Sequence, residues 1–421
     1  MRIAIMTAGS RGDVAPFTGL GAALVRAGHD VTLVTHGLFE ELTEGTGLGF
    51  HALSVDPRAE LESDAGRGLH RSTTGVGKLR RALSMAKAIA VDLADDMLAA
   101  ARDTDALIVS GPAVPLGWTI AEGLHLPSMG VNLQPLHPTR VFAPPLTGTR
   151  SLGPAANRLA GRAVGAAVES VCAEAARGIR SRLGLPPRGL TAARRARERQ
   201  GWPVAHGFSP AVVPRPRDWR PGLDVVGYLW PHDERQLPPD LDDFLDAGPA
   251  PVFVGLGSAT VPEPERLSGL VVRALRTAGL RGVIQQGWAN LAASGDDILT
   301  IGDVPHHRLF PRTAAVVHHA GAGTTAAGLR AGVPAVPLPV QFDETFWGNR
   351  LVALGTAPCS LPLRKVTADT LAAALVRVTS DSSYRTRAQA LAARLAAEDA
   401  VGPVHATLLR LADTEGARSR R

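Results

Sequence analysis

The chain has 421 residues, 45% hydrophobic and 20% charged, which are the proportions of a folded globular protein and exclude a disordered one. Its length predicts two or three domains. The net charge of +6 is dispersed along the chain, and its densest basic stretch, residues 188–199, contains a glutamate and no aromatic residue. Nucleic-acid binding is therefore not expected. The charge is expected to form a solvated surface that attracts an anionic substrate.

The chain shows no sign of a membrane or secretory segment. No apolar run approaches the roughly 20 residues that span a bilayer, and the first apolar run is too short for a signal peptide. Cys172 and Cys359 lie far apart and match no zinc or redox spacing. We therefore expect a cytoplasmic protein without stable membrane insertion.

The N-terminus reads as a βαβ unit. Residues Ile3–Ala8 predict a strand, which runs into the turn GSRGD at residues 9–13. Pro16 is expected to open a helix over Phe17–Ala27, and Asp30–Thr35 predicts the next strand. The turn does not match G-x-G-x-x-G, and no acidic residue closes the second strand. A simple NAD-binding fold is therefore disfavoured.

The middle of the chain continues this alternation. Its predicted elements are strands at Ala106–Ser110, Pro127–Leu133 and His206–Val213, and a helical region at Ala155–Leu183. Two stretches have little periodicity: Asp56–Gly77 is expected to be a mobile loop, and Asn132–Pro154 carries enough apolar groups to line a pocket.

Seven prolines between Pro210 and Pro239 predict a linker. Beyond it, the predicted elements are strands at Val252–Gly255, Gly282–Gln285, Ile298–Ile301, Ala315–Val317 and Ala335–Pro339, helices at 264–278 and 345–354, and a helical tail at Thr367–Ala412. Because each half begins with a strand that enters a glycine-serine turn, the chain predicts two doubly wound α/β domains facing each other across a cleft. We place them at residues 1–222 and 223–400, followed by a C-terminal helix and tail at 401–421.

The stretch from Val316 to Leu351 carries the strongest chemical signal. A β-branched strand is followed by HHAGAGTT and then by a helical pattern. The free N–H groups at such a helix start favour an anion such as a diphosphate, and the two glycines allow a ligand to approach closely. The following strand ends in Gln341-Phe342-Asp343-Glu344. If the two strands are neighbours, these acceptors would bind a hydroxyl-rich sugar beside the phosphate.

Four segments carry a resemblance to a known family: GSRGDVAPF at 9–17, GFSPAVVPRPRDW at 207–219, HHAGAGTTAAGLRAGVP at 318–334 and DETFWGNR at 343–350. They resemble the GT-B glycosyltransferases of family 1, in particular sterol 3-β-glucosyltransferase-like and vancomycin-type antibiotic glycosyltransferases. The resemblance implies a GT-B fold of two Rossmann-like domains. It implies an inverting transfer from a UDP- or TDP-sugar to a hydroxyl of a small hydrophobic aglycone, without an essential metal or cofactor. Such enzymes are monomers or homodimers.

The resemblance also assigns residues to the donor. The diphosphate would be bound by Ser258, His319, Gly321, Ala322, Gly323 and Thr324. Asp343 and Glu344 would bind the sugar. The backbone of Val304 would pair with the pyrimidine base of the nucleotide, with Trp288 nearby. Ser10 and Arg11 could reach the phosphates from the other domain, or Arg11 could be an ordinary surface charge.

Three positions depart from the family pattern. Glu344 stands where the family usually has Gln, and Ala327 stands where plant enzymes have Glu. Phe342 stands where sterol-type enzymes usually have Gly. The first and third leave the identity of the donor sugar open.

Attack by a hydroxyl at neutral pH needs a base, and Asp13 is the candidate, with helix capping as the alternative. His319 is expected to contact the diphosphate or to be a buried structural group, and His318 to be structural. Asp343 would bind the sugar or cap a helix, and Glu344 would bind the sugar or be solvated. Trp288 and Trp347 would stack on a ligand or pack in the core.

Two other functions share the architecture: a sugar-nucleotide epimerase and a non-catalytic sugar-nucleotide-binding partner protein. The apolar segment Asn132–Pro154 argues against the epimerase, which needs no acceptor site. Asp13 with a complete diphosphate turn argues against the non-catalytic protein.

Overall fold

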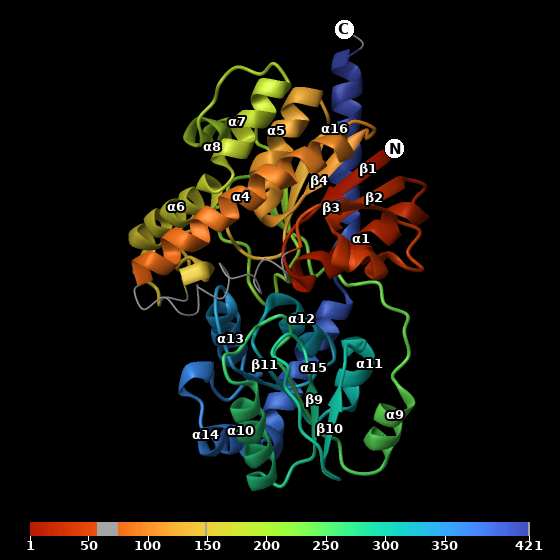
Figure 1. Cartoon of the computed structure of the whole chain (residues 1–421), viewed down its shortest axis with the longest axis vertical. Coiled ribbons are helices and arrows are strands. Elements are labelled where there is room, and N and C mark those ends of the chain that lie inside the picture. The colour runs from red at the N-terminus through yellow and green to blue at the C-terminus, as the bar shows by residue number, and fades with distance from the viewer. Residues whose placement is uncertain (57–74, 148–149, 420–421) are drawn as a thin grey trace.

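The structure, a computed structural model, describes residues 1–56, 75–147 and 150–419. Its strands form two sheets, both parallel throughout (Figure 1). In the described chain the first sheet has the order β3-β2-β1-β4-β5-β6-β7, with β1 (Arg2–Met6), β2 (Asp30–His36), β3 (Gly49–Leu53), β4 (Ala106–Val109), β5 (Ser128–Asn132), β6 (Val204–His206) and β7 (Leu223–Val225). The second has the order β10-β9-β8-β11-β12, with β8 (Val252–Gly255), β9 (Gly282–Gln285), β10 (Ile298–Ile301), β11 (Ala315–His318) and β12 (Ala335–Pro337).

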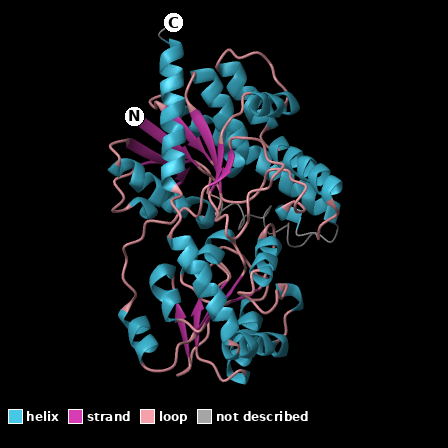
Figure 2. Cartoon of the chain, turned by 180° about the vertical axis from the view of Figure 1, so that it is seen from behind, coloured by secondary structure: helices cyan, strands magenta, loops and turns pink. Residues whose placement is uncertain are grey.

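Helices enclose the strands of each sheet, as the view from behind shows (Figure 2). Those before the linker are α1 (Arg11–Arg26), α4 (Gly75–Ala101), α5 (Val114–Leu124), α6 (Pro154–Ser170), α7 (Ala173–Arg182) and α8 (Leu190–Arg199). Those after it are α9 (Pro239–Asp246), α10 (Pro264–Thr277), α11 (His306–Leu309), α12 (Ala322–Arg330), α13 (Glu344–Ala353), α14 (Ala368–Ser380), α15 (Ser382–Ala396) and α16 (Val401–Ser419). No helix of the described ranges is both long and apolar enough to cross a bilayer.

Strand β1 shows why the sheets need helices on both faces. Ile3 and Ile5 enter one hydrophobic core, whereas Ala4 and Met6 enter the core on the opposite face. Because successive side chains point to opposite faces of a strand, a run that is apolar throughout is buried on both sides. This is the pattern of a doubly wound parallel sheet, and the predicted fold class is confirmed.

The chain changes direction across each sheet at one point. In the first sheet β1 lies between β2 and β4, and in the second β8 lies between β9 and β11. Ligands of open α/β sheets bind beyond the carboxyl ends of the strands at such switch points. The loops after β1, β8 and β11 are therefore the places where a site is expected.

Two segments beyond the predicted boundaries, β7 and α16, pack with the first sheet. Strand β7, within the proline-rich segment, pairs with β6, so the first sheet extends past residue 222. Residues 226–238 have no helix or strand and connect the sheets. Helix α16 returns to the first sheet, where Val404 and Leu408 share a core with Ile3. The division at residues 222 and 400 stays a prediction.

Three sequence-based expectations about elements were wrong. Helix α1 begins at Arg11, not at Pro16, because Ser10 and Asp13 already close its N-terminus. The strand expected at His206–Val213 ends at His206, since the Ser209 carbonyl accepts the amides of Val212 and Val213 in a turn. The long helical region is divided between α6 and α7. Most of the loop expected at Asp56–Gly77 lies outside the described residues.

Candidate functional site

Asp13 lies in the first turn of α1, directly beyond the end of β1. Its Oδ2 accepts the backbone N–H of Ser10 at 2.9 Å and the Ser10 hydroxyl at 3.0 Å, and its Oδ1 accepts the Gln134 amide at 3.2 Å. A carboxylate in this position satisfies free helix donors and favours the dipole. Asp13 therefore does cap its helix. Capping orients the carboxylate and does not exclude a catalytic role for it.

His36, a residue that the sequence did not single out, supports this turn. The backbone N–H of Gly9 donates to His36 Nε2 at 3.1 Å, while His36 Nδ1 lies 2.6 Å from the Val55 carbonyl. Because a carbonyl can only accept, His36 carries its proton on Nδ1. Burial lowers the pKa of His36 and keeps the ring neutral. His36 ends β2, beside β1 in the sheet, so pairing of these strands was the signal that could have found it.

His319 follows β11 and lies between two glycines. A Cβ atom on Gly321 would come within 2.3 Å of its Nε2, and one on Gly257 within 2.8 Å of its Cε1. Glycine at both positions therefore makes room for the ring. The His319 Nδ1 is buried and has no partner among the described residues, and burial lowers the pKa of the ring to about 4. At neutral pH the site thus contains an uncharged imidazole with an unused polar atom.

His318 has a different role. Its ring is buried, and its Nδ1 accepts the amide of Ala320 at 3.1 Å, a residue held at a φ of 67°. This bond stabilises the sharp turn that leads to Gly321, the N-cap of α12. The amides of the first turn of α12 have no partner within the helix and can bind an anion. His318 therefore has a structural contact, because its ring holds the backbone of the turn.

Asp343 precedes α13, beyond the end of β12, and β11 and β12 are neighbours as expected. Its Oδ2 accepts the indole N–H of Trp347 at 2.7 Å, and it makes no capping bond to its helix. Trp347 is fully buried and packs in the core, so it is not a stacking surface for a ligand. Burial raises the pKa of Asp343, and the negative charge of Asp13 raises it further. Asp13 and Asp343 are therefore close enough for their negative charges to repel each other.

Glu344 is hydrogen-bonded to the backbone of its own loop. Its Oε2 accepts the backbone N–H groups of Val340 at 2.6 Å and Gln341 at 2.7 Å. The side chain is buried, not solvated, and burial raises its pKa to about 7. This carboxyl group fixes the loop between β12 and α13. Phe342 lies in that loop with a φ of 50° and 65% of its surface exposed.

The remaining candidates lie at the start of α1 and after β8, β9 and β10. Ser258 follows β8, and the Gly257 carbonyl beside it accepts the amide of Trp288 at 3.0 Å. The side chain of Val304 is buried. Arg11 does not point freely toward a ligand: its guanidinium lies 3.3 Å from the Asp303 carboxylate in the other domain. We expected Arg11 to contact the phosphates or to be an ordinary surface charge. In the structure it forms an ion pair between the domains.

Family models match both ends of the chain. Residues 3–141 match the model described as the glycosyltransferase family 28 N-terminal domain. Residues 283–411 match the one described as erythromycin biosynthesis protein CIII-like, C-terminal domain.

Among curated proteins, the O-mycaminosyltylonolide 6-deoxyallosyltransferase of Streptomyces fradiae is 35% identical over 411 residues, 95% of each chain. Two sterol 3-beta-glucosyltransferases of Arabidopsis thaliana are 33% and 31% identical over 95% of this chain. The chain spans 64% and 66% of the length of these two plant relatives.

Solved structures share the whole architecture. The glycosyltransferase of kitacinnamycin has a TM-score of 0.69 at 18% identity, covering 97% of each chain. SnogD of Streptomyces nogalater has a TM-score of 0.67 at 21% identity, covering 98% of this chain and 99% of that one. SsfS6 of Streptomyces sp. SF2575, in complex with thymidine diphosphate, has a TM-score of 0.62 at 22% identity and full coverage of both. With two parallel-sheet domains and a relative that is similar over 95% of both chains, the chain belongs to the GT-B glycosyltransferases.

Proposed function

We propose that this protein transfers a sugar from a UDP- or TDP-sugar to a hydroxyl group of a hydrophobic acceptor. The observation that carries the proposal is the His319 ring between Gly257 and Gly321, with an unpartnered buried Nδ1 beside the free N-terminus of α12. A diphosphate supplies the oxygen atoms that such donors require. The thymidine diphosphate bound by SsfS6 supports a nucleoside diphosphate ligand of this kind.

The proposed reaction is a single in-line displacement. The acceptor oxygen forms a bond to the anomeric carbon while the bond from that carbon to the β-phosphate oxygen breaks. Asp13 takes the hydroxyl proton, and the nucleoside diphosphate leaves with the electron pair. One displacement inverts the anomeric configuration. His36, through Gly9, and Gln134 hold Asp13 in position, which is the orientation that general-base catalysis requires.

Charge on the leaving diphosphate develops at the other domain. The α12 amides at Gly321–Thr324, the Ser258 hydroxyl and His319 would stabilise it there. Asp343, held by Trp347, retains Oδ1 for a sugar hydroxyl. Only the Oε2 of Glu344 accepts a backbone hydrogen bond, so its Oε1 is proposed to contact the sugar. Because these groups can disperse the phosphate charge, the reaction needs no metal ion, and activity should persist in excess EDTA.

The acceptor is proposed to be an apolar natural product or a sterol-like molecule, of the macrolide, polyketide or glycopeptide type. Val141 and Leu152 are large apolar side chains that are 61% and 58% exposed, and both lie in the segment expected to line the acceptor pocket. Phe142 contacts Phe346 of α13, with ring centroids 5.3 Å apart, so this segment lies against the helix that follows Asp343. The names of the relatives support this class, because they include a tylonolide derivative and sterols as acceptors.

The test is a donor and acceptor screen by mass spectrometry, with UDP-glucose and TDP-deoxysugars against a panel of aglycones. We expect nucleoside diphosphate release only when an aglycone is present, together with a product of the summed mass. A coupling constant of the anomeric proton that shows an inverted centre would support the single displacement. Conversion of the donor to another sugar without an aglycone would indicate an epimerase, and binding without turnover a partner protein.

The phosphate role of His319 is tested separately by calorimetry with UDP and TDP. The variant His319→Ala should bind either nucleotide at least about tenfold more weakly, because it lacks one hydrogen bond to a charged group. His307→Ala, at a half-exposed histidine outside the glycine turn, is the control and should keep its affinity. Unchanged affinity in His319→Ala would remove the phosphate contact from the proposal.

A further inference from the structure

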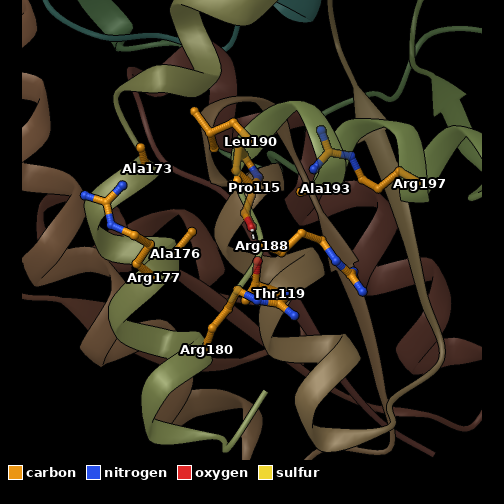
Figure 3. A pocket seen from close by; sticks show the side chains of 11 residues that line it. Pro115, Thr119, Ala173, Ala176, Arg177, Arg180, Arg188, Leu190, Ala193 and Arg197 are labelled. Carbon is orange, nitrogen blue, oxygen red and sulfur yellow. Dashed lines mark hydrogen bonds between the residues drawn. The ribbon is translucent and has the colours of Figure 1, made fainter. Parts of the chain in front are cut away.

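A hollow lined by arginines lies in the first domain, far from the loops described above. Its walls are α5, α7, the start of α8 and the segment between α7 and α8 (Figure 3). These helices occupy the end of the molecule remote from the second domain (Figure 1). About 30 Å³ of its interior is open to the centre of a water molecule, which is room for a small ion but not for an organic molecule.

Arg180 is the buried member of the lining. Only 4% of its side chain is exposed, its Nε donates to the Pro186 carbonyl at 2.8 Å, and its Nη1 donates to Glu122 at 2.6 Å. Its Nη2 is buried and has no partner among the described residues. A buried guanidinium N–H without an acceptor is costly, so this atom indicates a missing ligand.

The charges around the hollow do not balance. Arg177, Arg180, Arg188 and Arg197 all line it. Glu122 is shared by Arg180 and Arg188, which both lie 2.6 Å from it, and Glu169 is shared by Arg197 and Arg194. Arg177 is exposed at the rim, and it forms no ion pair with any described residue. Burial and the neighbouring cation Arg194 both lower the pKa of Arg197, although Glu169 opposes them.

The hollow also has the shape of an anion site. Arg188 and Arg197 both lie over the ring of Trp118, at 5.6 and 5.5 Å from its centroid, and this contact helps to fix their positions without neutralising them. Gly189 and Leu190, at the N-terminus of α8, complete the lining. In Figure 3 the side chain of Arg180 extends toward Thr119 and Arg188.

We propose that this hollow binds a small inorganic anion, chloride or phosphate, beside the Arg180 Nη2, and that the anion fastens α7 and α8 to α5. The anion supplies the acceptor that the Arg180 Nη2 lacks and offsets the excess of arginine over glutamate. Because chloride and phosphate share this chemistry, the experiment contains both.

The test is the melting temperature of the full chain at constant ionic strength, with chloride or phosphate replacing gluconate, which is too large for the hollow. We expect chloride or phosphate to raise the melting temperature by about 2–4 °C at tenfold excess over the dissociation constant. The larger shift of the two identifies the natural anion. Equal melting temperatures in all three salts would overturn the proposal.

Arg177→Gln and Arg182→Gln form a matched pair of variants, five residues apart on α7. Arg182 pairs with Asp95 outside the hollow and does not line it. Arg177→Gln should lose more than half of the anion-dependent shift, whereas Arg182→Gln should keep it. Equal losses would mean general surface charge and would contradict a site.

The variant Arg180→Lys and a bromide soak locate the ion. Lysine keeps the positive charge near Glu122 but lacks the second guanidinium nitrogen, so it should reduce the shift while the circular dichroism spectrum stays unchanged. In crystals soaked with sodium bromide, we expect an anomalous peak within hydrogen-bond distance of the Arg180 Nη2. An empty hollow at high bromide would reject the site even if the salts differ in melting temperature.

Discussion

The carboxylate of Asp13 shows how a capping residue can also be a reactive one. Ser10 engages one oxygen through two hydrogen bonds, and Gln134 reaches the other through a longer one. The second oxygen is therefore the one that can exchange its partner for a substrate hydroxyl. Capping and base catalysis, alternatives at the level of sequence, are compatible in this geometry.

Asp13→Asn should separate the two roles. Asparagine keeps an oxygen for the Ser10 amide, so we expect the free energy of unfolding to change by less than about 1 kcal/mol. It cannot accept a proton at neutral pH, so kcat should fall by about 10²–10⁴-fold. Steady-state kinetics with thermal denaturation measure both. A kcat close to that of the unchanged protein would reject Asp13 as the base.

At the scale of elements, the loop between β12 and α13 combines a buried acid with a strained aromatic residue. Glu344 binds the backbone at Val340 and Gln341, and this fixes the path of the chain through Phe342. A non-glycine residue at positive φ costs about 1–2 kcal/mol, so the loop needs such a restraint.

Glu344 should make stability depend on pH. Burial raises its pKa from 4.5 to about 7, so the folded state holds a proton that the unfolded chain releases. This stabilisation is full below pH 4.5 and is lost as pH rises through about 7. Relative to Glu344→Gln, which stays neutral, the free energy of unfolding should fall by about 3 kcal/mol across that window. Denaturant titrations at several pH values check this, and a constant difference would contradict it.

Phe342→Gly should relieve the backbone strain of the same loop. We expect the free energy of unfolding to rise by up to about 1 kcal/mol, because glycine adopts a φ of 50° without a steric penalty. Phe342→Ala removes the same ring but keeps the strained backbone, and it should show no such gain. If both variants were equally stable in urea, the strain would not be carried by this residue.

The sequence predicted most elements but few contacts. Strands at Gly282–Gln285 and Ile298–Ile301 agree with the structure to the residue, because short β-branched runs between turn residues are a local signal. The bond from His36 to Gly9 joins residues 27 positions apart and depends on strand pairing. Likewise, the turn of Glu344 toward its own loop depends on a rotamer, which residue type does not determine.

At the scale of the whole molecule, α16 joins the end of the chain to its beginning. Leu408 is fully buried in the core that contains Ile3, whereas Leu409, its neighbour, is 40% exposed. His405 of the same helix lies 2.8 Å from His29, at the end of α1. The C-terminal helix therefore belongs structurally to the first sheet.

Leu408→Ala should destabilise the first domain by about 2–5 kcal/mol, since it leaves a cavity in a closed core. Leu409→Ala should change stability by less than about 0.5 kcal/mol. Limited proteolysis, read by the positions of the first cuts, shows which domain opens. Cuts confined to the second domain in Leu408→Ala would contradict the assignment of α16.

The return of α16 also sets the order in which the protein can be completed during synthesis. Domains generally fold as units, with the first-made domain folding first. Here β1 is synthesised first, whereas Val404 and Leu408, which pack in the same core, are synthesised about 400 residues later. The domain made first must wait, with an open apolar face, until the second has emerged. A nascent chain of this protein is therefore exposed to chaperones and to aggregation for nearly the whole of its translation.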